Sequence, residues 1–555
     1  MWAKILLIIF VFSFLFRTDH SFDQDLGRHI KLGEIIIQTG QVPKINLFSY
    51  TNENFTFINT HWLFEVMAYF FSQTVGLQLF LIIKIIIIII SVWLTIKIIP
   101  KQDSSLLLPI GFIFLHVLRE RIELRPEIFS FLFTATTYYI LERYLRGPTR
   151  LIFLLPLIQL IWINAHIYFF IGLLLQTIFL IHLTHQYLRS HLESGRLKIL
   201  GIVFILSVLL SLINPNGLNG LLYPLNVTEN YGYNVVENQT MFLLESIKFR
   251  DVNFLFVKIS IGIVAFAFLY RLFKRKFDLK NILLALSGVG LALLHIRSFP
   301  YLVFLSLPAT LILLGEIRKN IITSFLFLVV CILLLLEAFL YLNGDYYKFT
   351  DNQHQARLDF VESSKGALDF TLSHNLPNPI FNNFDIGSYI LYRGYPKYQV
   401  FVDGRPEAYP AQFFTGIYIP AQSDYKNFKE AEEIYGFKTI IFSHTDQTPW
   451  GRTFLSAVIK DTSWKLVYID DFMLVLVKDE VAGERNIQSI DLSKLTPALY
   501  SFDNHVSYLR VSLFLLSTGN TESSRQFIQK SLQLFPDDPI ANSLIGQPAK
   551  NIFFW

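Results

Sequence analysis

The chain has 555 residues, of which 53% are hydrophobic and only 16% are charged. Soluble domains carry closer to a quarter charged residues, so the composition excludes a purely soluble protein. The formal net charge of +4 is too small to indicate nucleic-acid binding, and the single Cys331 excludes an intrachain disulfide or a cysteine-based metal site.

The first 343 residues carry a series of apolar stretches. A transmembrane helix needs roughly 20 apolar residues, and when shorter stretches are included the sequence predicts about eleven such helices. Residues 3–17 are interpreted as a retained helix, because no small-residue cleavage site follows them. The predicted spans are 3–17, 76–97, 104–118, 126–142, 150–164, 166–184, 198–213, 254–271, 281–296, 298–315 and 320–342.

Basic residues are concentrated in alternate loops between these spans. Short cytoplasmic loops carry an excess of Lys and Arg, so this alternation predicts a cytoplasmic N-terminus. The segments 18–75, 118–126, 164–166, 214–253, 295–299 and everything after 343 are then expected to face outward. The basic set is Lys97, Lys101, Arg143, Arg146, Arg150, Arg189, Arg196, Lys198, Arg271, Lys274, Arg275, Lys276, Lys280, Arg318 and Lys319.

The first outer loop, 18–75, is the most informative stretch. Asp25 to Thr39 has helical spacing with Gly40 as a C-cap, so Asp25 and His29 share one helix face. His61 and Glu65 have the same i,i+4 spacing on the next predicted helix. Two such pairs favour a site. The alternative is that Asp23 or Asp25 is an N-cap and His29 faces solvent.

Further polar residues lie at the outer ends of later spans. Glu120, Glu123 and Arg125 belong to a dense charge cluster, which forms either part of a site or a set of ion pairs. Asn164 with His166, and His295 with Arg297, occupy two tight junctions between spans. Residues of these types at a helix junction either bind an anion or cap helix carbonyls.

From about residue 344 the pattern changes to short apolar strands and polar helices. Residues 344–482 are expected to form an extracytoplasmic α/β domain, in which Asp403 and Arg405 are either functional or a structural ion pair. Residues 483–555 predict two amphipathic helices split at Gly519, similar to one tetratricopeptide-type hairpin that packs on this domain. The predicted strands are 379–383, 389–392, 399–402, 438–443 and 465–477, with helices near 356–374 and 426–435.

The motifs of the first outer loop, Asp-x-Asp-x-x-x-His, Phe-Ser-Tyr-Thr and His-Trp-Leu-x-Glu, resemble those of membrane glycosyltransferases with the GT-C fold. The similarity is to a mainly bacterial branch related to protein mannosyltransferases and aminoarabinose transferases. It extends over nearly the whole chain through short motifs at 125–126, 162–166, 214–217 and 402–405.

The resemblance implies a 1–343 GT-C-like membrane domain whose first loop carries an acidic active-site residue. Asp25 matches that position best and Asp23 second. Glu120 and Glu123 are the candidate counterparts of the family's second acidic pair, and the sequence leaves open whether a divalent cation is required. Candidate substrate contacts are His29, His61, Glu65, Arg125, Asn164, His166, His295 and Arg297.

The expected activity is inverting transfer of a hexosyl or pentosyl group from a polyprenyl-phosphate donor to a glycan, lipid or protein acceptor. A first-loop Asp would act as general base. The expected location is the cell (inner) membrane if the source is bacterial. Two alternatives remain: a non-catalytic assembly factor for surface glycans, and a transporter, which would need charged residues within several spans.

Overall fold

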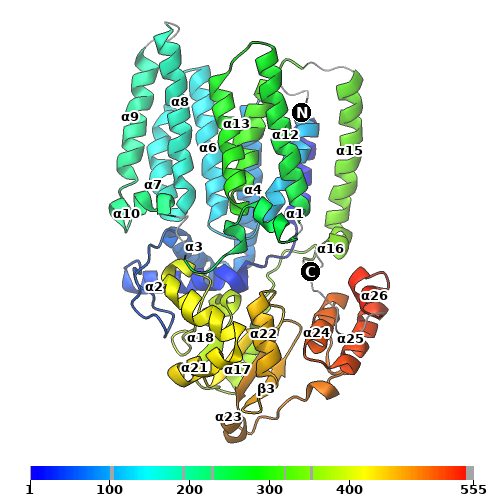
Figure 1. The fold of residues 1–555 in the computed structure, drawn as a ribbon. Helices are drawn as coiled ribbons and strands as arrows, with labels where there is room; N and C mark the ends of the chain where they lie inside the picture. The colour runs from blue at the N-terminus through cyan, green and yellow to red at the C-terminus, as the bar shows by residue number, and fades with distance from the viewer. Residues whose placement is uncertain are drawn as a thin grey trace.

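In a computed structural model the structure describes residues 2–100, 106–189, 194–226, 231–249, 251–317, 321–350 and 354–545. A bundle of apolar helices stands on a smaller mixed α/β part, with α2 (Gly27–Thr39) and α3 (Trp62–Gln73) between the two (Figure 1). The basic residues Lys101, Arg318 and Lys319 lie outside the described residues.

Each predicted span coincides with a helix or with a run of consecutive helical turns. Five helical runs are long and apolar enough to cross a membrane, and shorter apolar helices accompany them among the described residues. The bundle helices are α1 (Trp2–Leu15), α4 (Leu77–Ile98), α5 (Leu107–Val117), α6 (Glu127–Arg146), α7 (Leu155–Ala165), α8 (Phe170–Leu188), α9 (Ser194–Leu210), α12 (Val252–Phe273), α13 (Leu279–Leu294), α14 (Leu307–Leu313) and α15 (Ile321–Leu342).

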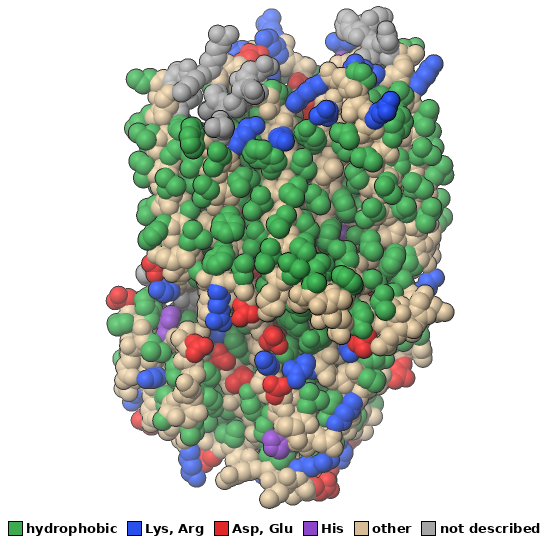
Figure 2. Space-filling view, turned by 180° about the vertical axis from the view of Figure 1, so that it is seen from behind, with side chains coloured by type: hydrophobic (Ala, Val, Ile, Leu, Met, Phe, Trp, Pro, Cys, Tyr) green, Lys and Arg blue, Asp and Glu red, His purple; other side chains and the backbone are tan. Residues whose placement is uncertain are grey.

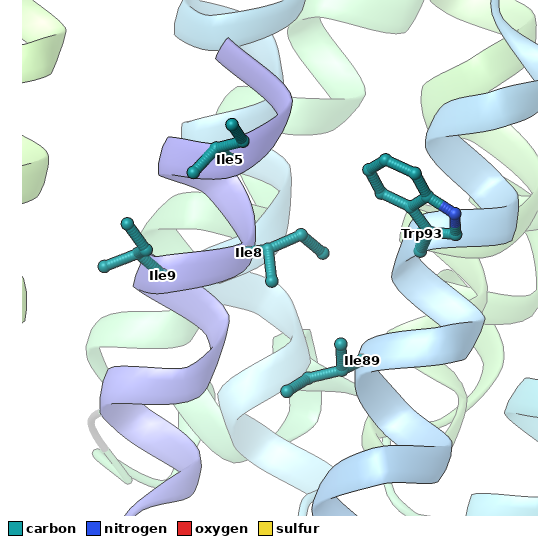
Figure 3. A pocket seen from close by; sticks show the side chains of 5 residues that line it. All are labelled: Ile5, Ile8, Ile9, Ile89 and Trp93. Carbon is teal, nitrogen blue, oxygen red and sulfur yellow. The ribbon is translucent and has the colours of Figure 1, made fainter. Parts of the chain in front are cut away.

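The flank of the bundle is a continuous apolar belt. Hydrophobic side chains cover it, Lys and Arg gather at the end away from the α/β part, and mixed charges begin at the other end (Figure 2). A shallow apolar recess in this belt lies between α1 and α4 and is lined by Ile5, Ile8, Ile9, Ile89 and Trp93 (Figure 3). Such a surface requires a hydrocarbon environment, so the chain is a membrane protein.

The α/β part contains one four-stranded sheet. Its strands are β1 (Ile380–Asn382), β2 (Thr439–Ser443), β3 (Trp464–Ile469) and β4 (Met473–Lys478), in the order β1-β2-β4-β3. β1 and β2 are parallel, whereas the other pairs are antiparallel. Both faces are buried, which explains why the strands are almost continuously apolar.

The two faces of the sheet pack against different partners. Along β4, Val475 joins the core that continues through α17 (Lys365–Ser373) and α18 (Gly387–Gly394) into the membrane helices. Leu474 and Leu476 join a second core with α21 (Tyr425–Tyr435) and α22 (Pro449–Val458). The α/β part is therefore docked on the bundle through a shared hydrophobic core.

The terminal hairpin consists of α24 (His505–Ser517) and α25 (Thr521–Leu534), and α26 (Pro539–Ile545) follows it. Gly519, at φ +86°, lies in the turn between the first two helices. Phe514 and Phe527 enter the second core, so the hairpin packs on the sheet.

Two expected strands are wrong. Residues 389–392 lie in the helix α18, because Tyr389, Ile390 and Leu391 form a short apolar run that fits either period and here packs on α2. Residues 399–402 form no strand of the sheet, and Val400 makes an isolated bridge to Ser49 of the first outer loop. The helix expected near 356–374 begins only at Lys365, because Phe360 bridges to Asp19 instead.

Candidate functional site

Asp25 lies in the polar layer between the bundle and the α/β part, directly before α2. Asp25 belongs to a π-helical turn, Phe22–Leu26. One carboxylate oxygen of Asp25 is 3.0 Å from an Arg28 nitrogen, and the other is 3.2 Å from Nε of Arg125. The Asp25 side chain is 22% exposed, so a substrate can reach it.

Asp23 occupies a different environment although it is only two residues away. It is buried, and its two oxygens accept the backbone N–H groups of Ser363 and Ser364 at 2.8 and 2.9 Å. Burial raises the pKa of Asp23 to about 6 despite these hydrogen bonds. Both acceptor oxygens are therefore engaged in holding the segment that leads into α17.

Glu237 gathers three arginines beside Asp25. Its oxygens are 2.6 Å from Arg125 and 3.3 Å from Arg297, and it also pairs with Arg121. Burial alone would raise the pKa of Glu237, but these guanidinium groups hold it well below its usual value. Arg121 is fixed on its other side by Glu127, at 2.7 Å. Glu237 therefore holds three guanidinium groups together, and one of them, that of Arg125, reaches the Asp25 carboxylate.

Arg297 is the least constrained of these arginines. Its side chain is 31% exposed, its contact with Glu237 is long, and its Nε atom has no hydrogen-bond partner among the residues that the structure describes. The Nδ1 atom of the neighbouring His295 donates a hydrogen bond to the backbone oxygen of Asn238 at 2.8 Å. Arg297 can therefore bind an added anion without first losing a strong pairing.

Three histidines form a second wall of this layer. The ring centroids of His29 and His61 are 5.8 Å apart, and those of His61 and His166 are 5.4 Å apart. Burial lowers the pKa of His29 well below its usual value and that of His61 to about 3. The imidazoles of His29 and His61 are therefore neutral, so they can donate or accept a hydrogen bond without adding charge.

The remaining predicted site residues hold this wall together. Glu65 lies 3.3 Å from His29 Nδ1 and accepts a 2.7 Å hydrogen bond from Asn59, and burial raises the pKa of Glu65 to about 7. His166 Nδ1 is 2.7 Å from the Ser130 hydroxyl. Asn164 accepts a hydrogen bond from the Trp62 indole at 2.8 Å, which ties α3 to the end of α7.

The acidic residues of the second outer loop are held apart. Glu123 is bound by Arg17 at 2.6 Å, whereas Glu120 accepts a hydrogen bond from Asn253. Burial and then the nearby Asp251 raise the pKa of Glu120 to about 8. Among the described residues no group of three or more His, Cys, Asp or Glu side chains converges as metal ligands. The donor set around Asp25, which consists mainly of arginines, does not fit a divalent cation.

The outer-domain motif 402–405 packs against the turn that carries Asp25. Arg405 pairs with Asp403 at 2.7 Å, both are buried, and the guanidinium lies over the rings of Phe48 and Phe57. A Cβ at Gly404 would lie 2.9 Å from the Gln24 carbonyl oxygen, so this close approach requires glycine. The Asp403–Arg405 pair therefore positions the turn that carries Asp25 and is itself removed from solvent.

Two acidic residues of this layer had no signal in the sequence. Glu237 lies in a polar loop with no helical period, and Asp385 lies in a turn, Phe384–Ile386, of the outer domain. Burial and then the carboxylates of Asp446, Asp25 and Glu237 raise the pKa of Asp385 to about 7. Only the long-range fold brings these residues together, so no local spacing could have identified them.

Comparisons with known proteins give a result at the level of fold alone. No protein-family model and no curated protein sequence matches the chain. A solved structure of the archaeal oligosaccharyltransferase AglB from Archaeoglobus fulgidus, in complex with an inhibitory peptide and a dolichol-phosphate, is similar with a TM-score of 0.53 and 10% identity. The match covers 99% of this chain and 87% of that chain.

The apo form of the Archaeoglobus fulgidus oligosaccharyltransferase matches with a TM-score of 0.47 and 10% identity, over 84% of this chain and 73% of that chain. The AglB match spans both the bundle and the outer part, and it agrees with the resemblance carried by the sequence motifs. The chain therefore shares the fold of this archaeal oligosaccharyltransferase, the GT-C fold.

Proposed function

We propose that the protein is a membrane glycosyltransferase that transfers a sugar from a polyprenyl-phosphate donor to a hydroxyl acceptor at the outer face of the membrane. The observation that carries this proposal is the pairing of the accessible carboxylate of Asp25 with the arginines Arg28 and Arg125 at the edge of the apolar belt. The similarly folded archaeal enzyme carries a dolichol-phosphate, which supports a lipid-phosphate donor for this chain.

The donor lipid fits the position of the site. A polyprenyl chain can stay in the hydrocarbon while its phosphate reaches the polar layer. Arg297 and Arg125 are the proposed phosphate contacts, because guanidinium groups bind phosphate oxygens with two hydrogen bonds at once. His61, His166 and His295 complete the proposed donor surface, whereas His29, Glu65 and Asn164 are assigned to holding it in place.

The reaction is a single displacement. The acceptor hydroxyl oxygen attacks the anomeric carbon, its proton passes to the Asp25 carboxylate, and the bond between that carbon and the phosphate oxygen breaks. The electron pair of this bond leaves with the polyprenyl phosphate, whose developing charge the arginines stabilise. Attack opposite the leaving group inverts the anomeric configuration. No step requires a metal ion.

The orientation follows from the charges at the two ends of the bundle. Lys and Arg gather at the end far from the α/β part, which supports a cytoplasmic position for that end (Figure 2). We therefore propose a cytoplasmic N-terminus, about eleven spans and an outward α/β domain with its helical hairpin. A transporter fits less well, because charged residues lie mainly at the ends of the helices.

Substitution of the proposed base tests the mechanism. Asp25→Asn keeps the shape of the side chain but removes its basicity, so we expect turnover to fall by roughly 10²-fold or more while donor binding is retained. The assay is release of polyprenyl phosphate from a panel of undecaprenyl-phosphate-linked hexoses and pentoses by the protein in nanodiscs.

Asp23→Asn is the matched control. It removes a carboxylate that holds two backbone amides, so we expect a lower melting temperature with the turnover of the folded fraction preserved. Full activity of Asp25→Asn would contradict the assignment of the base and would favour a non-catalytic assembly factor.

A further inference from the structure

We propose that the recess between α1 and α4 is a binding site for an anionic phospholipid, with one acyl chain in the recess and the headgroup phosphate at Lys97. The recess lies between the N-terminal part of α1 and the C-terminal part of α4, in the half of the bundle away from the α/β part (Figure 1). The site is therefore remote from the polar layer around Asp25, and it is independent of the transferase function proposed above.

The recess has an entirely apolar lining. Ile5, Ile8 and Ile9 of α1 form one wall, and Ile89 and Trp93 of α4 form the other (Figure 3). Its volume of about 190 Å³ is several times the roughly 30 Å³ that a water molecule takes in the liquid. Hydrocarbon is expected to fill such a space in a membrane, because the lining side chains would otherwise lose dispersion contacts.

A lipid chain can enter the recess from the flank of the bundle. The side of α1 that carries Leu7 and Phe10 is buried in the protein core. Ile5 and Ile9, in contrast, are 38% and 41% exposed, and Trp93 is 37% exposed. The recess therefore opens toward the surrounding lipid and needs no movement of the helices to receive a chain.

A cation stands at one end of the recess. Lys97 lies one turn beyond Trp93 in the last turn of α4, and its Nζ atom is 5.3 Å from the centroid of the Trp93 ring. Lys97 is exposed, and no carboxylate pairs with it in the part of the chain that the structure describes. Neither α1 nor α4 contains Asp or Glu. The charge of Lys97 is therefore available to an external anion.

The order of these groups matches that of a phospholipid. From Lys97 through Trp93 to Ile89, α4 changes from charged to aromatic to apolar, as a phospholipid changes from phosphate through its ester region to the acyl chain. Lysine and tryptophan are typical anchors at the membrane interface. An anionic headgroup fits better than a zwitterionic one, whose own cation would lie beside Lys97 and be repelled by it.

Native mass spectrometry of the full chain in detergent tests the site, because it resolves bound lipids one at a time. The probes are phosphatidylglycerol and phosphatidylcholine with identical acyl chains. We expect the wild type to bind one phosphatidylglycerol about tenfold more tightly than phosphatidylcholine, and Lys97→Gln to remove this preference. Ile5→Trp fills the recess from its exposed edge, so it should weaken the binding of both lipids.

Lys274→Gln is the matched control. Lys274 follows α12, and its Nζ atom is 5.8 Å from the centroid of the Tyr270 ring, so it forms the same kind of pair at the same i,i+4 spacing. Tyr270 does not line the recess. Lys274→Gln should therefore keep the preference of the wild type for phosphatidylglycerol.

Three results would overturn the proposal. Equal binding of the two lipids by the wild type, or an equal loss in Lys97→Gln and Lys274→Gln, would show that basic charge acts without the recess. Unchanged lipid binding by Ile5→Trp would place the acyl chain elsewhere. Displacement of phosphatidylglycerol by undecaprenyl phosphate, with Ile5→Trp weakening the latter as well, would assign the recess to a polyprenyl chain.

Discussion

Two aspartates separated by one residue have different tasks in the first outer loop. The sequence places Asp23 and Asp25 near the start of one helix and ranks them only through a family resemblance. The structure separates them, because Asp23 accepts two backbone amides whereas Asp25 meets two guanidinium groups. This distinction depends on Ser363 and Arg125, which are far away in the sequence, so no reading of the loop alone could have provided it.

Replacement of Arg297 tests the role of a single side chain in donor binding. Because it makes one long contact with Glu237 and retains 31% exposure, Arg297→Ala should leave the melting temperature close to that of the wild type. Loss of a charge-assisted phosphate contact should weaken binding of a polyprenyl-phosphate donor by about 1.5–3 kcal/mol. The measurement is a donor titration of the protein in nanodiscs, with a thermal unfolding scan in parallel.

Arg393→Ala provides the comparison, since Arg393 also pairs with one carboxylate and its side chain is 30% exposed, but it lies in the outer domain away from the arginine cluster. It should leave donor affinity unchanged. If Arg297→Ala instead unfolds the protein and the affinity of the folded fraction is normal, Arg297 is a structural residue.

Helices α2 and α3 are the elements on which the site depends. They were expected from i,i+4 pairs, and the Gly40 C-cap was predicted correctly, with φ +68°. Their mutual packing could not be predicted, because it depends on a close approach at Gly33. There a Cβ would lie 2.0 Å from the Glu65 carbonyl oxygen. The strand expected at 389–392 failed for a similar reason. A short apolar run is compatible with both helical and strand periods, and only its packing on α2 makes this segment the helix α18.

Gly33→Ala should therefore displace helix α3 as a whole rather than a single side chain. The added methyl group must push α3 away, and overpacking of this kind costs typically 1–3 kcal/mol. We expect a lower melting temperature and reduced turnover, because α2 carries His29 and follows directly on Asp25.

Gly262→Ala in α12 is the matched change, since a Cβ there meets nothing within 4 Å. It should be neutral or slightly stabilising. Equal melting temperatures for the two variants would show that the α2–α3 contact is looser than the structure indicates.

The arrangement of the membrane helices corresponds to the order of apolar segments along the chain. Every expected span meets a helix, because long apolar runs leave little choice of structure in a bilayer. The α/β part was recognisable only in outline. Its docking on the bundle depends on contacts between distant segments, such as the bridges of Asp19 to Phe360 and of Ser49 to Val400.

The orientation of the whole chain is tested with single cysteines in a Cys331→Ser background. Ser373 is exposed at the end of α17, and Lys276 is exposed in the turn between α12 and α13. In intact cells an impermeant thiol reagent should label Ser373→Cys and not Lys276→Cys, whereas both should react after permeabilisation. The reverse pattern would place the site on the cytoplasmic face.

The central claim is that the arginines beside Asp25 receive a lipid phosphate. It is tested most directly by a cryo-EM structure of the protein in nanodiscs with undecaprenyl phosphate. The account predicts a phosphate bound by Arg125 and Arg297 next to the Asp25 carboxylate, with the isoprenoid chain lying along the apolar belt. A phosphate bound at another position, with the contacts of Asp25, Arg125 and Glu237 unchanged, would contradict it.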